Sequence, residues 1–283
     1  MIIDGKKCAT KILETIFAKV KKLPSAPKIV FLLVGENPAS QLYVKKKKQT
    51  CEKLSLQSEV LRFSEKVTQK EILLTLQTLN KDPSVHAILV QMPLPKTLNP
   101  YEIIEAIDPK KDVDGFHPLN LGRLLQGNRN ALAPCTPLAV QYLLKIHKVD
   151  LTQKEVVIIG RSNVVGKPLM ALLVQNHPDA NATVTLCHSK TPNLSFFTRK
   201  AEVLICATGK AKMITATMVK KGAVVIDVGI SRYEGKLSGD VDFEAVKEKA
   251  SLITPVPGGV GPMTIAMLMQ NTLLCYEKQR KST

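Results

Sequence analysis

Tryptophan is absent from this 283-residue chain, and aromatic side chains make up only 4% of it. Few nucleic-acid bases could stack on such a surface, which argues against a single-strand nucleic-acid binder. Long apolar runs are also missing, because stretches such as IVFLLV (29–34) are far shorter than the roughly 18 residues of a membrane span. We expect neither nucleic acid nor a membrane among its partners.

Paired cysteines are missing as well. The six cysteines are scattered and form no CxxC motif, which argues against a zinc site and a disulfide framework, so no metal is expected. The first residues, MIIDGKKCATKIL, show no cleavage-like small-residue site, and no signal peptide is predicted. Reduced thiols without a signal predict a cytoplasmic protein.

Acidic residues are few: 24 stand against 40 lysines and arginines, which gives a net charge of +16. The excess forms no tail, because residues 1–140 and 141–283 each carry +8. Charge spread in this way is typical of a protein that attracts small polyanions. A basic RNA-binding α/β protein is the alternative from another class, and it predicts charge gathered on one face.

Short apolar runs alternate with amphipathic segments along the whole chain, which predicts an α/β fold. The runs are rich in β-branched residues and lack strict alternation, as in parallel strands buried on both faces. Strands are predicted at 28–35, 58–64, 86–92, 155–160, 182–188, 202–209 and 223–229, and helices near 38–54, 68–80 and 100–107.

Two α/β domains are predicted. A connecting helix and a polar loop near 135–150 divide residues 1–140 from residues 141–261, which form a Rossmann-like parallel sheet. The apolar face of a last helix, 262–283, must cover something, and we expect it to return to the first domain. Two crossings would leave a cleft flanked by the domains, where a ligand could bind.

The segment VVIIGRSNVVGKP predicts a strand, a turn and a helix N-terminus that suits a phosphate. Gly160, Ser162 and Gly166 make up this turn, although their spacing differs from GxGxxG. Two later strands end in CATG and DVGI, where small residues let the backbone approach a ligand. The candidate cofactor contacts there are Thr208, Gly209 and Ile230.

The end of the strand at 182–188 indicates which dinucleotide is bound. A domain that prefers NAD usually has an acidic residue there for the ribose hydroxyls. This chain offers Ser189 and Lys190 instead, with Arg161 on the preceding turn. Donors and positive charge favour the 2′-phosphate of NADP, and NAD is the less favoured alternative.

Four consecutive lysines (45–48) occur in the helix predicted over 38–54, for which Asn37 is the N-cap. At 100° per residue only Lys47 falls on the apolar face, one turn after Tyr43. Loss of hydration lowers the pKa of such a lysine toward the range of a general base. The alternative is a lysine that snorkels along an interface without a role in chemistry.

Two further segments bring polar groups near strand ends. Gln91 ends a buried strand in HAILVQMPLP, a position that suits a ligand site. The loop DPKKDVDGFHP carries Asp112 and Asp114, and either aspartate could instead cap an Asx-turn.

Taken together and in order, these stretches resemble the bifunctional methylenetetrahydrofolate dehydrogenase/methenyltetrahydrofolate cyclohydrolase family over essentially the whole chain. The matching motifs are IDGKKCA, GENPASQLYVKKKK, VQMPLP, KDVDGFHPLNLGRL, PCTP, GRSNVVGKP, CHSKT, CATGK, DVGI, GDVDF and TPVPGGVGPMT. The resemblance implies oxidation of 5,10-methylenetetrahydrofolate by NADP, then hydrolysis of the methenyl product to 10-formyltetrahydrofolate in the same cleft. A dehydrogenase with weak or no cyclohydrolase activity is the alternative within enzymes.

The resemblance also implies a role for each matching residue. Lys47 would transfer protons in the cyclohydrolase step, and Gln91 would hydrogen-bond and tune it. Tyr43 would stack on the pterin side of the folate, and Asp114 would hold the pterin nitrogens. Three residues of a glycine-rich loop would close over the folate and the nicotinamide: Gly258, Gly259 and Pro262. NADP would be carried by Arg161, Ser162 and Ser189.

The same resemblance implies a homodimer and a domain assignment: residues 1–140 with 262–283 bind folate, and residues 141–261 bind NADP. The positive surface further suits folates that carry acidic polyglutamate tails.

Overall fold

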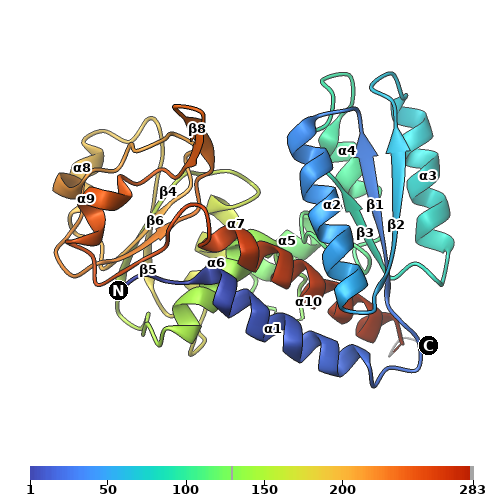
Figure 1. Ribbon diagram of the computed structural model, residues 1–283, viewed down its shortest axis with the longest axis horizontal. Coiled ribbons are helices and arrows are strands. Elements are labelled where there is room, and N and C mark those ends of the chain that lie inside the picture. Colours follow the sequence, from blue (N-terminus) through green and yellow to red (C-terminus); the bar gives the residue numbers. More distant parts are fainter. Residues whose placement is uncertain (129, 281–283) are drawn as a thin grey trace. The chain divides into compact units, whose positions relative to one another are not determined.

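The computed structural model describes residues 1–128 and 130–280, which form two compact units (Figure 1). We call residues 11–123, 130–133 and 268–280 the first unit, and residues 1–10, 124–128 and 134–267 the second unit. Three helices contribute residues to both units: α1 (Gly5–Val20), α5 (Pro118–Leu125) and α10 (Val260–Arg280). Residues 281–283, the end of the predicted last helix, lie outside the described residues.

A three-stranded parallel sheet in the order β2-β1-β3 forms the centre of the first unit. Its strands are β1 (Lys28–Val34), β2 (Gln57–Phe63) and β3 (Ala87–Val90), and its further helices are α2 (Pro38–Lys53), α3 (Gln69–Lys81) and α4 (Pro100–Glu105). Strand β1 is central and almost wholly buried, and all of β3 is buried. The strands and helices predicted for this half are confirmed, with ends that differ by a few residues.

Helix α2 begins where the sequence predicts. Asn37 Oδ1 accepts hydrogen bonds from the N–H groups of Ala39 and Ser40, at 3.0 and 3.1 Å. A side-chain cap of this kind stabilises a helix by about 1 kcal/mol, and Pro38 is well tolerated in the first turn. The helix therefore starts directly after the carboxyl end of β1, the edge at which α/β sheets bind ligands.

A five-stranded parallel sheet in the order β10-β7-β6-β4-β5 forms the second unit. Its strands are β4 (Glu155–Ile159), β5 (Thr183–Cys187), β6 (Val203–Cys206), β7 (Val224–Asp227) and β10 (Leu252–Ile253). The helical segments are α6 (Cys135–Ile146), α7 (Gly166–Leu173), α8 (Leu194–Thr198), η1 (Ala216–Met218) and α9 (Phe243–Lys247), and β8 (Ser231–Tyr233) pairs with β9 (Lys236–Ser238) in a hairpin. In chain order the five strands run 2-1-3-4-5, so the sheet is doubly wound and its order reverses between β4 and β6.

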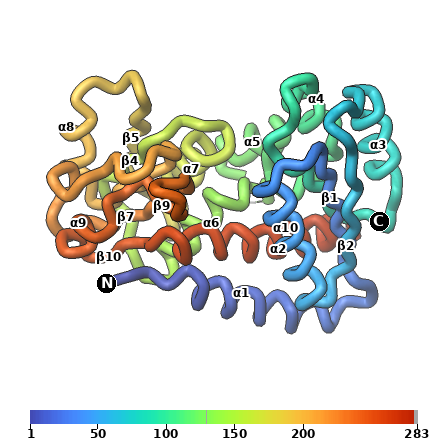
Figure 2. Tube along the Cα trace, turned by 45° about the horizontal axis from the view of Figure 1, so that its top comes forward, coloured from blue at the N-terminus to red at the C-terminus, as the bar shows by residue number. Residues whose placement is uncertain are grey.

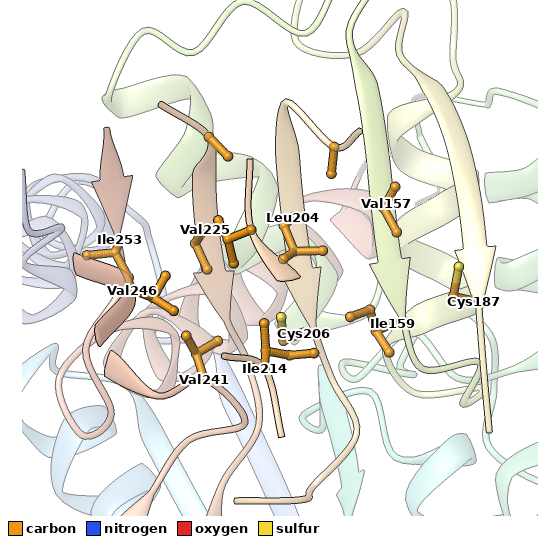
Figure 3. Packing of buried hydrophobic residues seen from close by; sticks show 13 residues of the cluster. Val157, Ile159, Cys187, Leu204, Cys206, Ile214, Val225, Val241, Val246 and Ile253 are labelled. Atoms are coloured by element: carbon orange, nitrogen blue, oxygen red, sulfur yellow. The ribbon is translucent and has the colours of Figure 1, made fainter. Parts of the chain in front are cut away.

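Buried aliphatic side chains cover this sheet (Figure 3). Val157 and Ile159 of β4 lie beside Leu204 and Cys206 of β6, and Val225 of β7 continues the layer. Burying one such side chain stabilises the fold by roughly 1.5–3 kcal/mol, so a layer of this size holds the strand ends firmly in place. The Rossmann-like parallel sheet predicted from the sequence is confirmed.

Strands β2 and β5 differ from the prediction that all these strands are buried on both faces. Along β2 exposed and half-buried residues alternate, and β5 has one fully buried residue, Cys187. Both are edge strands, each paired on one side. Strand β3, at the other end of the first sheet, is fully buried and is also bridged to the segment at Asp112. The prediction was wrong for these two strands, because a single-sequence pattern does not say which strand lies at an edge.

The last part of α10 belongs to the first unit, as predicted. Cys51 Sγ of α2 lies 3.6 Å from Met269 Sδ, and Asn271 Nδ2 donates to the carbonyl oxygen of Val113 at 2.9 Å. In Figure 2 the red trace of α10 runs beside the blue trace of α2. Although α10 has 21 residues, no helix in the described ranges is both long enough and apolar enough to cross a membrane.

Candidate functional site

Helix register separates the four consecutive lysines of α2. Lys47 is half-buried, whereas Lys45, Lys46 and Lys48 are exposed. The buried residues of the helix, Ser40, Val44 and Cys51, recur with Lys47 at intervals of three and four. The prediction that Lys47 alone shares the buried face is therefore confirmed.

Lys47 and Gln91 meet at the carboxyl edge of the first unit's sheet. Lys47 Nζ donates a hydrogen bond to Gln91 Oε1 at 3.0 Å, and Gln91 Nε2 donates to the backbone oxygen of Met92 at 2.6 Å. The second bond orients the amide so that its oxygen faces the lysine. A neutral acceptor holds the ammonium group in place without neutralising it, and two of its three N–H bonds remain for other partners.

Tyr43 lies one turn before Lys47 on α2, and its side chain is 41% exposed. It is at the rim of the buried face, with the phenol ring accessible. An accessible aromatic ring beside a held lysine can stack on a planar ligand.

The two aspartates of the KDVDG loop have different environments. Asp112 is buried and accepts hydrogen bonds from the N–H groups of Phe116 and His117 and from Asn120 Nδ2. Burial raises the pKa of Asp112, and these hydrogen bonds oppose that rise. Asp112 therefore holds the loop, the capping role that the sequence left open for either aspartate.

Asp114 is half-buried and follows a segment that extends the sheet. Asp112 pairs with Ile88 of β3 in a parallel bridge, and Ile88 N donates to the carbonyl oxygen of Lys111 at 2.8 Å. Two parallel segments end at the same edge, so Asp114 and Gln91 both follow strand ends on the side where α2 begins.

The turn after β4 is built around two glycines. Gly160 has φ of +120°, and a Cβ there would lie 2.2 Å from the carbonyl oxygen of Ala207, which follows β6. A Cβ on Gly166 would lie 1.8 Å from the carbonyl oxygen of Gly160. No other residue type fits either position. The backbone of this turn therefore packs closely against the loop after β6, where the strand order reverses.

The other predicted residues of this turn face solvent. Arg161 and Ser162 are exposed, and Ser162 Oγ accepts a hydrogen bond from the N–H of Val165 at 3.1 Å. The N-cap residue of α7, Val165, makes no side-chain capping hydrogen bond. Ser189, after β5, is exposed as well, and a helix N-terminus such as that of α7 can bind an anion.

The loop after β6 is held by a buried carboxylate. The backbone N–H groups of Thr208 and Gly209 donate to Asp240 Oδ2, at 2.5 and 3.3 Å, and Asp240 is fully buried. The predicted residue Ile230, after β7, is 46% exposed.

Asp227, the last residue of β7, is buried beside Asp240. Its Oδ1 accepts from the N–H groups of Gly229 and Asp240, at 3.2 and 3.0 Å, and its Oδ2 from the N–H of Val241, at 2.9 Å. Burial raises the pKa of Asp227 to about 7, and the neighbouring Asp240 adds to that rise. The sequence interpretation missed both aspartates, although the motifs DVGI and GDVDF contain them.

Gly258, Gly259 and Pro262 belong to the second unit, so the predicted substrate-binding residues come from both units. Gly258 has φ of +112°, and a Cβ on Gly5 of α1 would lie 1.9 Å from the carbonyl oxygen of Gly259. Pro262 is half-buried in the first turn of α10. The glycines thus allow close backbone packing at the start of two helices.

Two family models match this chain. The catalytic domain of tetrahydrofolate dehydrogenase/cyclohydrolase matches residues 3–114, and its NAD(P)-binding domain matches residues 134–280. A relative from Nautilia profundicola, called bifunctional protein FolD, is 50% identical over 276 residues, which are 96% of this chain and 95% of the relative.

Solved structures agree with the family models. The bifunctional enzyme FolD, a methylenetetrahydrofolate dehydrogenase/cyclohydrolase from Campylobacter jejuni, is 48% identical with a TM-score of 0.95, and the match covers 100% of this chain and 99% of that one. The FolD enzyme of Trypanosoma brucei, complexed with NADP cofactor and an inhibitor, is 32% identical with a TM-score of 0.93, over 99% and 98% of the two chains.

These findings confirm the resemblance, the α/β fold, the enzyme class and the cofactor expected from the sequence. The half of the chain that carries Lys47 matches the catalytic model, and the half that carries Gly160 matches the NAD(P)-binding model. The chain belongs to the tetrahydrofolate dehydrogenase/cyclohydrolase family of bifunctional enzymes.

Proposed function

We propose that this enzyme oxidises 5,10-methylenetetrahydrofolate with NADP and hydrolyses the methenyl product to 10-formyltetrahydrofolate, with Lys47 at the centre of proton transfer. The observation that carries the proposal is the hydrogen bond between Lys47 Nζ and Gln91 Oε1, at 3.0 Å. It joins the one half-buried lysine of a lysine run to the end of a neighbouring buried strand.

Lys47 moves protons during hydrolysis of the methenyl cation. Water that adds to the methenyl carbon must lose a proton, and a folate nitrogen must gain one as the ring opens. A lysine amine, formed when the ammonium group gives its proton to solvent, can take the first proton and return it to the nitrogen. The remaining hydroxyl proton leaves to solvent as the formyl C=O forms and the bond between that carbon and the nitrogen breaks. Gln91 keeps the lysine nitrogen in one position through both transfers, because its amide is itself fixed to the backbone of Met92.

Tyr43 and Asp114 bind the folate in this proposal. The phenol ring of Tyr43 is exposed beside Lys47 and can stack on the pterin. The carboxylate of Asp114 accepts hydrogen bonds from the pterin amino group and ring nitrogen, a charge-assisted contact. Gly258, Gly259 and Pro262 line the folate and the nicotinamide.

The second unit fits NADP. The dinucleotide supplies the hydride acceptor, and the protein holds it in place. Gly160 and Gly166 bring the chain close enough for a pyrophosphate to reach the N-terminus of α7. Arg161, Ser162 and Ser189 offer donors to the 2′-phosphate, and the backbone at three further positions faces the cofactor: Thr208, Gly209 and Ile230.

The proposed division of labour is that residues 1–140 with 262–283 bind folate and residues 141–261 bind NADP. Polyglutamylated folates are the preferred substrates, because 40 basic residues attract acidic tails. Equal affinity for mono- and polyglutamylated substrate at low salt would contradict that preference. The enzyme is a cytoplasmic homodimer, and sedimentation analysis tests the dimer.

The test is to supply 5,10-methylenetetrahydrofolate with NADP or NAD and to follow the methenyl absorbance as it rises and decays. We expect both phases with NADP and a slower rise with NAD. Absence of a cofactor-dependent rise would end the dehydrogenase proposal. A rise with no faster decay than in buffer would leave the dehydrogenase and remove the cyclohydrolase.

A further inference from the structure

Asp227 and Asp240 are each packed against a glycine from the other's segment. A Cβ on Gly229 would lie 2.0 Å from Asp240 Oδ1, and a Cβ on Gly239 would lie 1.9 Å from Asp227 Oδ2. Such contacts are far below van der Waals distance, so only glycine leaves room for either carboxylate. The segments Asp-Val-Gly (227–229) and Gly-Asp (239–240) therefore pack together, with the carboxylate of each segment against the glycine of the other.

Burial of two neighbouring acids is unfavourable unless other contacts offset it. Five backbone N–H bonds do so here, and they come from the loop after β6, the loop after β7 and the segment after β9. Three of the five N–H groups belong to buried residues, Gly229, Asp240 and Val241, and would be left unpaired without these acceptors. The acids thus connect segments far apart in the chain.

We infer that Asp227 and Asp240 are positioning residues for the dinucleotide, which hold the backbone at 208–209 and 229–230 in the shape that receives it. This inference rests on the proposed function, in which Thr208, Gly209 and Ile230 contact the cofactor. Neither aspartate touches the reacting atoms in this role. They act through the two loops whose N–H groups they bind.

Replacement by asparagine should affect Asp240 and Asp227 differently. Asp240 accepts both of its N–H bonds at Oδ2, and its Oδ1 has no hydrogen-bond partner in the described part of the chain. Asparagine can therefore keep both bonds with its single oxygen. Asp227 accepts at both oxygens, so the NH₂ of an asparagine would oppose a backbone N–H.

The experiment compares Asp240→Ala, Asp240→Asn, Asp227→Ala and Asp227→Asn at pH 8, above the pKa of Asp227. Two readouts are measured: the KM and Kd for NADP, and hydrolysis of supplied methenyltetrahydrofolate without NADP. We expect Asp240→Ala to raise both constants for NADP about tenfold to a hundredfold, because two N–H groups lose their acceptor. Asp240→Asn restores values within about threefold of wild type, whereas Asp227→Asn remains as impaired as Asp227→Ala.

Asp242→Asn is the matched control, since Asp242 is half-buried nearby and its side chain does not cap α9. It should leave NADP binding unchanged. Unaltered NADP constants in Asp240→Ala, or equal damage from both asparagine variants, would overturn the inference. If the alanine variants fail to fold, the contrast between the two asparagine variants decides the question alone.

The hydrolysis readout separates this inference from the proposed function. A positioning role changes the NADP constants and leaves methenyl hydrolysis at the wild-type rate. Failure of the proposed function would instead appear in the wild-type enzyme, as absent NADP binding or absent hydrolysis.

Discussion

The two units prepare their sites by different means. In the first unit a side chain meets a side chain: Lys47 and Gln91 are brought together by the register of α2 and the end of β3. In the second unit the backbone itself is shaped, because glycines at 160, 166, 229 and 239 leave no room for a Cβ. One site should therefore be sensitive to loss of a functional group and the other to gain of a methyl group.

Lys47→Met should have the largest effect. We expect hydrolysis of methenyltetrahydrofolate to fall about 100-fold to 10,000-fold, the usual contribution of a general acid–base group. Hydride transfer to NADP should remain measurable, because the second unit is unchanged. Stopped-flow absorbance resolves the two phases.

Lys46→Met is the control for that variant, since Lys46 is exposed on the same helix. It should keep both rates within about twofold of wild type. Comparable damage from the two substitutions would refute the argument from helix register.

Gly166→Ala should impair NADP binding and leave methenyl hydrolysis intact, the opposite of Lys47→Met. Its Cβ would lie 1.8 Å from the carbonyl oxygen of Gly160, so the turn must open and NADP affinity should fall by more than about tenfold. Unfolding of the second unit should become easier by about 3–5 kcal/mol, measured by urea denaturation. Methenyl hydrolysis measured in buffer without urea should persist.

Gly122→Ala is the matched substitution, because nothing lies within 4 Å of a Cβ built on this helical glycine of α5. It should stabilise the protein by about 0.5–1 kcal/mol. The two glycine substitutions need not change the stability by equal amounts. If Gly122→Ala destabilised the protein, the space around the Cβ would not be what decides the effect of alanine at positions 122 and 166.

The pKa of Asp227 predicts how the second unit responds to pH. The pKa is raised from 3.8 to about 7, so the folded protein binds a proton more tightly than the unfolded chain does. The stability from this group is full below about pH 4 and is lost as pH rises through about 7, on the order of 1.4 kcal/mol for each pKa unit. Asp240 and Cys206 face the same interior, and burial raises the pKa of Cys206 well above its usual value, so that thiol stays protonated.

Urea midpoints at pH 5 and pH 8 test this dependence. The difference in stability between wild type and Asp227→Asn should be larger at pH 5 than at pH 8, while Asp242→Asn keeps the wild-type slope. Parallel slopes for wild type and Asp227→Asn would show that Asp227 does not titrate in this range.

Gln91→Met should have a smaller effect on methenyl hydrolysis than Lys47→Met. Loss of the oxygen that holds Lys47 should slow hydrolysis about tenfold to a hundredfold, because the lysine nitrogen is no longer fixed. NADP binding should not change. A decrease as large as that of Lys47→Met would indicate that Gln91 itself takes part in proton transfer.

The sequence predicted those features that depend on local pattern. Lys47 separates from its neighbours through helical periodicity alone, and Asn37 and Gly166 mark element starts by their own chemistry. The exposed edges at β2 and β5 could not be predicted, since they depend on strand order, which no local pattern contains.

The aspartate pair was missed for a related reason. Asp227 and Asp240 are separated by a hairpin, and each looks like an ordinary loop carboxylate until the fold brings its glycine partner against it. The distinction between Asp112 and Asp114 likewise required the fold, which buries Asp112 and brings the N–H groups of Phe116 and His117 to it.

Helix α10 has a consequence for the order in which the protein is made. The sheet of the first unit and its helices α2, α3 and α4 are complete by residue 123. Met269 and Asn271, which contact Cys51 and the carbonyl oxygen of Val113, are synthesised about 145 residues later. At roughly 5–20 residues per second, the first unit waits about 7–30 s on the ribosome for its last helix. The second unit, which includes residues 1–10 and ends at residue 267, has its whole chain before then, so the first unit is the one that finishes last.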